Sequence, residues 1–157
     1  MLHIDLIILG KLKETFWQEA EAEYLKRLKP WAKIIIHELR EESFSDKDNI
    51  ETIKQKEAEK IINTLEKIKD AHIIVLDEHG KNFSSKQFAG QFTELEQFHH
   101  LTFIIGGPLG LDESILKLAN LKLSMCSITF THQMARVFLW EQIYRAMMIN
   151  AGRNYHY

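Results

Sequence analysis

Short apolar runs alternate along the chain with longer segments in which apolar residues recur every three or four positions. A short apolar run predicts a β-strand, whereas the longer spacing predicts an amphipathic helix. Most of the runs end at glycine or at a group of polar residues, which is typical of the end of a strand. The runs that we expect to form strands are His3–Leu9, Lys33–Leu39, His72–Leu76, Leu101–Ile105 and the first part of Leu121–Phe130.

Segments with helical spacing follow these runs. Two of them open with the spacing of a capping box, Asp48 with Glu51 and Ser84 with Gln87. Strands that alternate with helices indicate the α/β class, with a parallel sheet and helices on both faces, and we expect one domain over residues 1–157. The predicted helices are Glu14–Leu28, a segment from Asp48 to Ile68, a segment from Ser84 to Phe98, Asp112–Leu118 and Thr131–Asn150.

The last predicted helix differs from the others because apolar residues fall on all of its sides. A helix that is apolar all round is buried all round. A second subunit is the commonest way to cover such a helix in a short chain, and symmetric dimers are the commonest oligomers. We therefore expect a homodimer that covers Trp140, Ile143 and Met147, and the alternative is a central core helix within one chain.

Composition narrows the class of protein. The chain has 157 residues, of which 45% are hydrophobic and 27% charged, as expected of a globular domain. No stretch approaches the ~20 apolar residues of a membrane span. The single cysteine, Cys126, fits a reducing compartment, so we expect a cytoplasmic protein. The eight histidines lack metal-ligand spacing, so no metal is expected, and the net charge of −2 does not favour a free nucleic-acid binder.

The segment LTFIIGGPLG, residues 101–110, is the strongest candidate for a ligand site. It lacks the pattern of a dinucleotide fingerprint or of a P-loop. Two further loops, after Leu76 and after Ser124, would lie at the same edge of a parallel sheet, where ligands bind in open α/β folds. Backbone amides and small residues without a phosphate cradle suit adenosine without a polyphosphate, and S-adenosylmethionine is such a ligand. The alternative is that all three loops are plain connections.

The end of the chain is the second candidate site. Residues 153–157 read Arg-Asn-Tyr-His-Tyr. Aromatic residues beside Arg153 and His156 suit stacking on a nucleobase and contact with phosphate. The alternative is a disordered terminus without a function.

Taken in order, these motifs resemble the RlmH family (formerly YbeA) of SPOUT methyltransferases. The resemblance implies a C-terminal trefoil knot, a homodimer and S-adenosylmethionine as the cofactor. It also implies methylation of N3 of a pseudouridine in 23S ribosomal RNA, on the large subunit or assembled ribosome. The matching segments are ILGKLKE near the start, LDEHGK with the following FSS, FIIGGPLG, LSMCSITFTHQMARVFLWEQIYRA and the terminal YHY.

The resemblance also implies roles for particular residues. The RNA would contact His132 and Arg136, in addition to Arg153 of the tail. The catalytic residues would be Arg145, Tyr155 and His156. The residues that would bind the cofactor are Leu76, Gly106, Met125, Cys126, Ser127, Ile128, Thr129 and Phe130.

Methyl transfer to a ring nitrogen requires that its proton be removed and that the base be oriented toward the methyl group. A cation such as Arg145 or a base such as His156 would favour the anionic base, and Tyr155 would stack on it or orient it. Two other functions stay open from the residues alone. They are a non-catalytic dimeric α/β protein that binds an adenosine ligand, and a purely structural dimer.

Overall fold

The computed structural model describes residues 1–155 and contains five strands and five helices in strict alternation. This order confirms the alternation predicted from the apolar pattern. In chain order the elements are β1 (Leu2–Leu9), α1 (Thr15–Leu28), β2 (Ala32–Leu39), α2 (Ile50–Leu65), β3 (His72–Asn82), α3 (Ser85–Glu96), β4 (His100–Ile105), α4 (Glu113–Leu118), β5 (Leu121–Ser124) and α5 (His132–Asn150).

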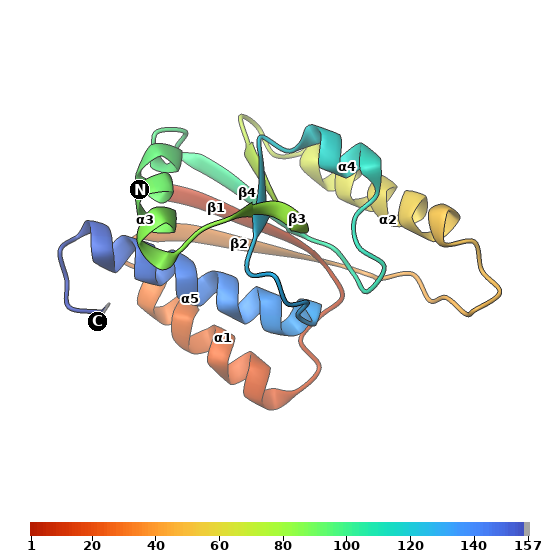
Figure 1. The fold of residues 1–157 in the computed structure, drawn as a ribbon, viewed down its shortest axis with the longest axis horizontal. Helices are drawn as coiled ribbons and strands as arrows, with labels where there is room; N and C mark the ends of the chain where they lie inside the picture. The colour runs from red at the N-terminus through yellow and green to blue at the C-terminus, as the bar shows by residue number, and fades with distance from the viewer. Residues whose placement is uncertain (156–157) are drawn as a thin grey trace.

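All strand pairs are parallel, and the strands lie in the order β2-β1-β4-β3-β5. Helices α1, α3 and α5 cover one face of the sheet, and α2 and α4 cover the other (Figure 1). The predicted α/β class with helices on both faces is therefore confirmed. Because the strands are parallel, their carboxyl ends meet at one edge of the sheet. The trefoil knot stays a prediction.

Strand β1 has an unbroken apolar run in its second half, from Leu6 to Leu9. Leu6 and Ile8 face the core under α1, α3 and α5, whereas Ile7 and Leu9 face the core under α2 and α4. Side chains alternate between the two faces of a strand, so a strand covered on both sides needs apolar residues at successive positions.

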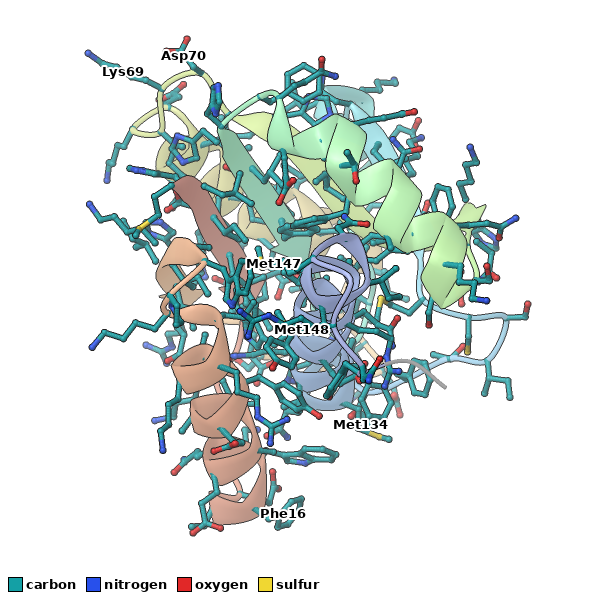
Figure 2. All side chains as sticks on the ribbon, turned by 90° about the vertical axis from the view of Figure 1, so that its left-hand side faces the viewer. Phe16, Lys69, Asp70, Met134, Met147 and Met148 are labelled. Carbon is teal, nitrogen blue, oxygen red and sulfur yellow. The ribbon has the colours of Figure 1, made fainter. Side chains whose placement is uncertain are left out.

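Helix α5 is covered within a single chain. Trp140 and Ile143 are fully buried, and Met147 is 4% exposed. These side chains belong to the core formed with the sheet, α1 and α3, and Figure 2 shows Met147 on α5. The expectation that a partner must cover Trp140, Ile143 and Met147 is therefore wrong, because the chain's own layers bury them. The homodimer itself stays a prediction.

Strand β3 is longer than predicted. It continues to Asn82 instead of ending at Leu76. The pairing with β5 shifts register on the way, since Leu76 and Lys81 both lie opposite Leu123. A Cβ on Gly80 would lie 2.7 Å from backbone atoms of β5, so glycine is required at this close approach. The apolar pattern stops at Leu76, which is why the sequence did not reveal the rest of the strand.

The two predicted capping boxes have different outcomes. Ser84 and Gln87 form the complete box at the start of α3, as predicted. The box predicted at Asp48 is wrong, because Asn49 caps α2 by accepting from the Thr52 amide at 3.2 Å.

Apolar side chains at the outer ends of helices also reach solvent. Phe16 of α1 is 60% exposed and points away from the molecule in Figure 2.

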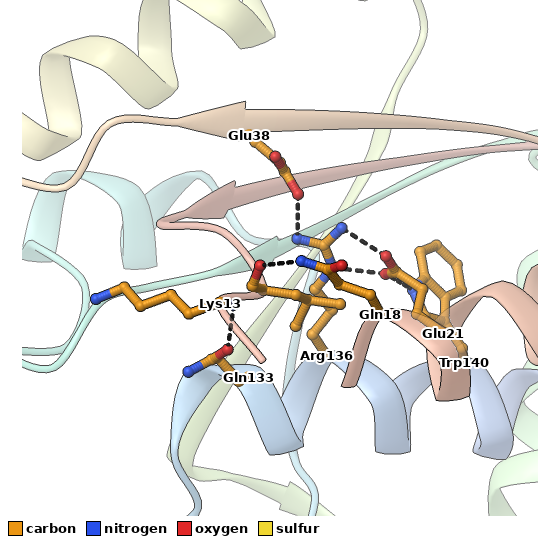
Figure 3. A network of polar contacts seen from close by, with 8 residues as sticks. Lys13, Gln18, Glu21, Glu38, Gln133, Arg136 and Trp140 are labelled. Atoms are coloured by element: carbon orange, nitrogen blue, oxygen red, sulfur yellow. Dashed lines mark hydrogen bonds and ion pairs between the residues drawn. The ribbon is translucent and has the colours of Figure 1, made fainter. Parts of the chain in front are cut away.

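Arg136 of α5 holds a buried polar network together (Figure 3). Its side chain is 3% exposed and donates to both carboxylate oxygens of Glu21 on α1, at 2.5 and 2.7 Å. It also donates to Glu38 of β2 at 2.6 Å, and Trp140 Nε1 donates to Glu21 at 2.8 Å. Burial alone would lower the pKa of Arg136, but the hydrogen bonds to Glu21 and Glu38 outweigh it and raise the pKa. The guanidinium is thus always charged and fully paired.

The same region fixes the loop after β1. Gln18 of α1 donates to the Leu12 carbonyl at 3.0 Å, and the Lys13 amide donates to Gln133 of α5 at 2.8 Å. These contacts join the loop to the starts of α1 and α5 (Figure 3). Polar contacts with α1, β2 and this loop therefore help to hold α5 in place, together with its packing against α3.

We predict that Arg136→Ala lowers the free energy of unfolding by about 3–5 kcal/mol, because it leaves Glu21 buried without its partner. Urea denaturation measures this loss. The double variant Glu21→Gln, Arg136→Met should recover a large part of it, since no buried charge remains unpaired. A loss below about 1 kcal/mol for the single variant would show that the pair contributes no more than an exposed ion pair.

Candidate active site

A cavity of about 370 Å³ opens between α3, α5 and the end of β5. Its size falls in the range of small-molecule sites, and most of its wall is aromatic or aliphatic with a few polar groups. Two of the predicted cofactor residues, Met125 and Phe130, and the predicted catalytic residue Arg145 belong to the wall. The lining residues are Phe83, Ser85, Phe88, Leu123, Ser124, Met125, Phe130, Phe138, Glu141, Gln142 and Arg145.

The loop after β5, residues 125–130, is held by local hydrogen bonds. Ser124 Oγ donates to the Cys126 carbonyl at 3.1 Å, and Cys126 Sγ accepts from the Ile128 amide at 3.1 Å. Thr129 Oγ1 donates to Glu78 of β3 at 3.3 Å, which joins this loop to the extended part of β3. Cys126 therefore stabilises the turn in this loop through its sulfur.

Glu141 brings two of the predicted catalytic residues, Arg145 and Tyr155, together beside the cavity. Its carboxylate accepts from Arg145, with Nε at 3.0 Å, from Gln142 Nε2 at 2.6 Å and from the Tyr155 hydroxyl at 3.4 Å. The Arg145 guanidinium also lies 4.9 Å from the centre of the Tyr155 ring. Tyr155 packs edge-on against Tyr144, with ring centres 4.9 Å apart. The tail up to Tyr155 is thus docked on α5.

The protonation states of this group follow from its contacts. Burial, together with a hydrogen bond between Tyr155 and Tyr24, raises the pKa of Tyr155 to about 12. The hydrogen bond that Arg145 donates to Glu141 raises the pKa of Arg145. At neutral pH the site therefore presents a protonated phenol and a cationic guanidinium, so Tyr155 can donate a hydrogen bond but cannot accept a proton.

The other predicted cofactor residues lie outside the cavity wall. Leu76 packs its side chain against the main core, one strand away on β3. Gly106 follows β4, and a Cβ there would lie 3.0 Å from the Leu111 side chain, so this turn is closed by its own residues. Ser127 to Thr129 are exposed, with Ile128 at 76%. The structure thus brings together the two ends of the predicted run 125–130 with Arg145, but not Leu76 or Gly106.

The residues predicted to contact RNA lie in different environments. Arg136 is turned inward onto Glu21 and Glu38, so the prediction that it faces RNA does not fit this structure. His132 packs beside Gly10, and its Nε2 is buried without a hydrogen-bond partner among residues 1–155. Arg153 is exposed and lies over the Trp31 ring at 5.3 Å. His156 lies outside the described residues.

Sequence reasoning missed three polar residues of the cavity. Glu141 is the acceptor for Arg145, and Ser85 donates to Gln142 at 3.1 Å across the cavity wall. The spacing of Glu141 and Arg145, four positions apart on a helix, is a signal for an ion pair that was available from the sequence. The Ser85–Gln142 contact joins α3 to α5 and has no local sequence signal.

Comparison with known proteins identifies the family to which this chain belongs. The profile described as "Predicted SPOUT methyltransferase" matches residues 2–156. The chain belongs to the SPOUT methyltransferase family. It is 41% identical over 160 residues to the "Ribosomal RNA large subunit methyltransferase H" of Symbiobacterium thermophilum, with 99% of each chain covered. Proteins of the same name from Clostridium acetobutylicum and Bifidobacterium adolescentis are 41% and 44% identical, again with 99% of each chain covered.

A SPOUT methyltransferase needs a methyl donor, and the cavity wall combines apolar and polar side chains. Met125, Phe130 and Phe138 supply apolar surface, and Ser124 and Glu141 supply polar atoms.

Within residues 1–155 there is no group of three or more His, Cys, Asp or Glu side chains placed to hold a metal ion. No helix in that part of the chain has the length and apolar character to cross a membrane.

We predict that Tyr155 of this SPOUT methyltransferase ionises well above the ordinary pKa of a tyrosine. The difference between the ultraviolet titrations of the wild type and Tyr155→Phe should show a midpoint near 12, against 10 for an ordinary tyrosine. Because the folded pKa is the higher one, docking of the tail is stabilised up to about pH 10 and loses this stabilisation as the pH rises toward 12. A midpoint close to 10 would show that the tail is undocked in solution.

Proposed function

We propose that this protein transfers a methyl group from S-adenosylmethionine to N3 of a pseudouridine in 23S ribosomal RNA, on the large subunit or the assembled ribosome. Membership of the SPOUT methyltransferases supports methyl transfer. The name shared by the relatives, ribosomal RNA large subunit methyltransferase H, supports ribosomal RNA as the substrate. The observation that carries the proposal for this chain is that Glu141 of the cavity wall contacts both Arg145, another lining residue, and Tyr155.

Residues at the cavity would hold the cofactor. Met125, Phe130 and Phe138 offer apolar surface for an adenine ring, and the backbone of residues 125–130 offers amides for its edge. Leu76 and Gly106 stay part of the proposal as residues of the neighbouring carboxyl-end loops, although they do not line the cavity. When bound, S-adenosylmethionine supplies an electrophilic methyl group.

The chain's own residues would prepare the base. Arg145 carries a positive charge next to the cavity, and a cation favours the anionic form of a ring nitrogen. The Tyr155 hydroxyl keeps its proton at neutral pH and donates a hydrogen bond to Glu141, so Tyr155 would orient the base by stacking and would not remove the N3 proton. His156 is the proposed base by resemblance, and it lies outside the described residues. Glu141 holds Arg145 and Tyr155 in place.

The assembled substrate and the dimer complete the proposal. A chain with a net charge of −2 lacks the overall positive charge of a free RNA binder. Recognition of a folded ribosome, which presents one nucleotide at a defined place, removes the need for such a charge.

The partly exposed Phe138 and the exposed Ile128 beside the cavity are apolar surface that a second subunit would cover.

Methyl transfer from labelled S-adenosylmethionine to ribosomes that lack this modification tests the proposal directly. We expect label in 23S RNA at N3 of one pseudouridine, located by mass spectrometry of nuclease fragments. Binding of the cofactor without transfer to any ribosomal substrate would favour the non-catalytic adenosine-binding protein instead.

The cavity can be tested by filling it. Met125→Trp should place a larger side chain in the cavity, and overpacking of about 1–3 kcal/mol corresponds to roughly 5- to 150-fold weaker cofactor binding. Calorimetry with S-adenosylmethionine measures this. Ile50→Ala is the control, because this exposed apolar residue lies on α2, outside the cavity wall. Equal affinity of the wild type and Met125→Trp for S-adenosylmethionine would show that the cofactor binds at another site.

We predict that the C-terminal tail contributes to positioning of the target base and contributes little to cofactor binding. Deleting Asn154–Tyr157 should abolish methyl transfer and leave most of the cofactor binding intact, because the described residues of the tail do not line the cavity. Tyr155→Ala should give an intermediate rate, since stacking on an aromatic ring contributes about 1–3 kcal/mol per base. A truncated protein with the wild-type rate would show that the tail has no role in catalysis.

A further inference from the structure

Two exposed arginines near the tail are stacked on aromatic rings. The Arg27 guanidinium of α1 lies 5.5 Å from the centre of the Tyr24 ring and 5.7 Å from that of Tyr144. Arg153 of the tail lies 5.3 Å from the centre of the Trp31 ring. The end of α1 and the C-terminal tail lie on the same side of the molecule (Figure 1). We call Arg27, Trp31 and Arg153 the α1–tail surface.

This surface continues into the candidate active site. The Tyr144 ring that faces Arg27 also packs against Tyr155, with ring centres 4.9 Å apart. Tyr155 in turn lies under Arg145 at the cavity. A strand of RNA whose target base reaches Tyr155 would therefore have its neighbouring nucleotides beside the α1–tail surface.

Positive charge is concentrated here although the whole chain has a net charge of −2. Lys26 and Arg27 lie in the last turn of α1, and Lys29 follows it. Glu23 pairs with Arg27 at 2.7 Å, but the two side chains are 50% and 40% exposed, so the pair is weak and Arg27 can exchange Glu23 for another anion. Arg153 has no carboxylate partner among residues 1–155.

We infer that the α1–tail surface binds the phosphate backbone of the substrate RNA next to the target nucleotide. A guanidinium that stacks on a ring keeps its N–H edge directed outward and loses little side-chain entropy when that edge binds phosphate through two hydrogen bonds. The inference rests on the proposed function for the identity of the RNA. It adds Arg27 and Trp31, on α1 and the loop after it, to residues of the last helix and the tail.

The test separates this surface from the methyl-transfer reaction. Binding of a fluorescent single-stranded oligouridylate is measured by anisotropy over a series of KCl concentrations, with the full chain and without cofactor. On a single strand, each phosphate that the protein neutralises contributes about 0.7 to the slope of log affinity against log salt, so Arg27→Gln, Arg153→Gln should lower that slope by about 1.4. The control Lys47→Gln, Lys117→Gln removes the same charge from exposed positions outside the surface and should keep the wild-type slope.

A second pair of variants keeps the result independent of folding defects. The double variant Arg27→Lys, Arg153→Lys keeps the charge and removes the planar fork of the guanidinium. It should keep most of the salt slope but bind the oligonucleotide several-fold more weakly than the wild type.

The double variant Arg27→Gln, Arg153→Gln should also raise the KM for ribosomes several-fold and leave kcat within about twofold, because it removes binding that is equal in the ground and transition states.

A wild-type slope in the Arg27→Gln, Arg153→Gln variant, or an equal decrease in the Lys47→Gln, Lys117→Gln control, would overturn the inference. Failure of the wild type to methylate ribosomes would instead contradict the proposed function, and the oligonucleotide data would still decide whether the surface binds RNA.

Discussion

The buried ion pair between Arg136 and Glu21 is the contact on which the arrangement of α5 depends. Two charges taken out of water are stable only when each is fully paired, so their geometry leaves little freedom. Arg136 reaches α1 through Glu21 and β2 through Glu38, and Trp140 donates to the same Glu21 carboxylate. The pair therefore fixes where α5 lies on the sheet, and with it the position of every side chain that α5 presents.

The candidate active site depends on that position. One side of α5 carries Arg136 and Trp140 into the core, and another carries Glu141 and Arg145 to the cavity. Helix α3 and the end of β5 supply much of the remaining wall, and the loop after β5 leaves the edge at which all carboxyl ends meet. The tail then returns onto α5, where Tyr155 contacts Glu141 and Tyr144. A rigid helix thus joins the apolar cavity to the polar group beside it.

Arginines of similar appearance in the sequence have different roles for physical reasons. Arg136 is buried and paired with carboxylates of two other elements, so it stabilises the fold. Arg145 is paired with Glu141 in the wall of the cavity. Arg27 and Arg153 lie over aromatic rings in solvent, where their edges can reach phosphate. Burial and partner, rather than residue type, separate structure from function here.

The sequence by itself determined the alternation of strands and helices, the parallel sheet, the box at Ser84 and the family, because these depend on periodicity and on motifs that are local in the chain. Only the tertiary structure decided that the chain itself buries Trp140, that Arg136 faces inward and that Leu76 lies outside the cavity. Glu21 and Arg136 are 115 residues apart, and no local pattern reports a partner at that distance. The role of a charged or aromatic side chain is set by what packs against it, and the fold alone brings those neighbours together.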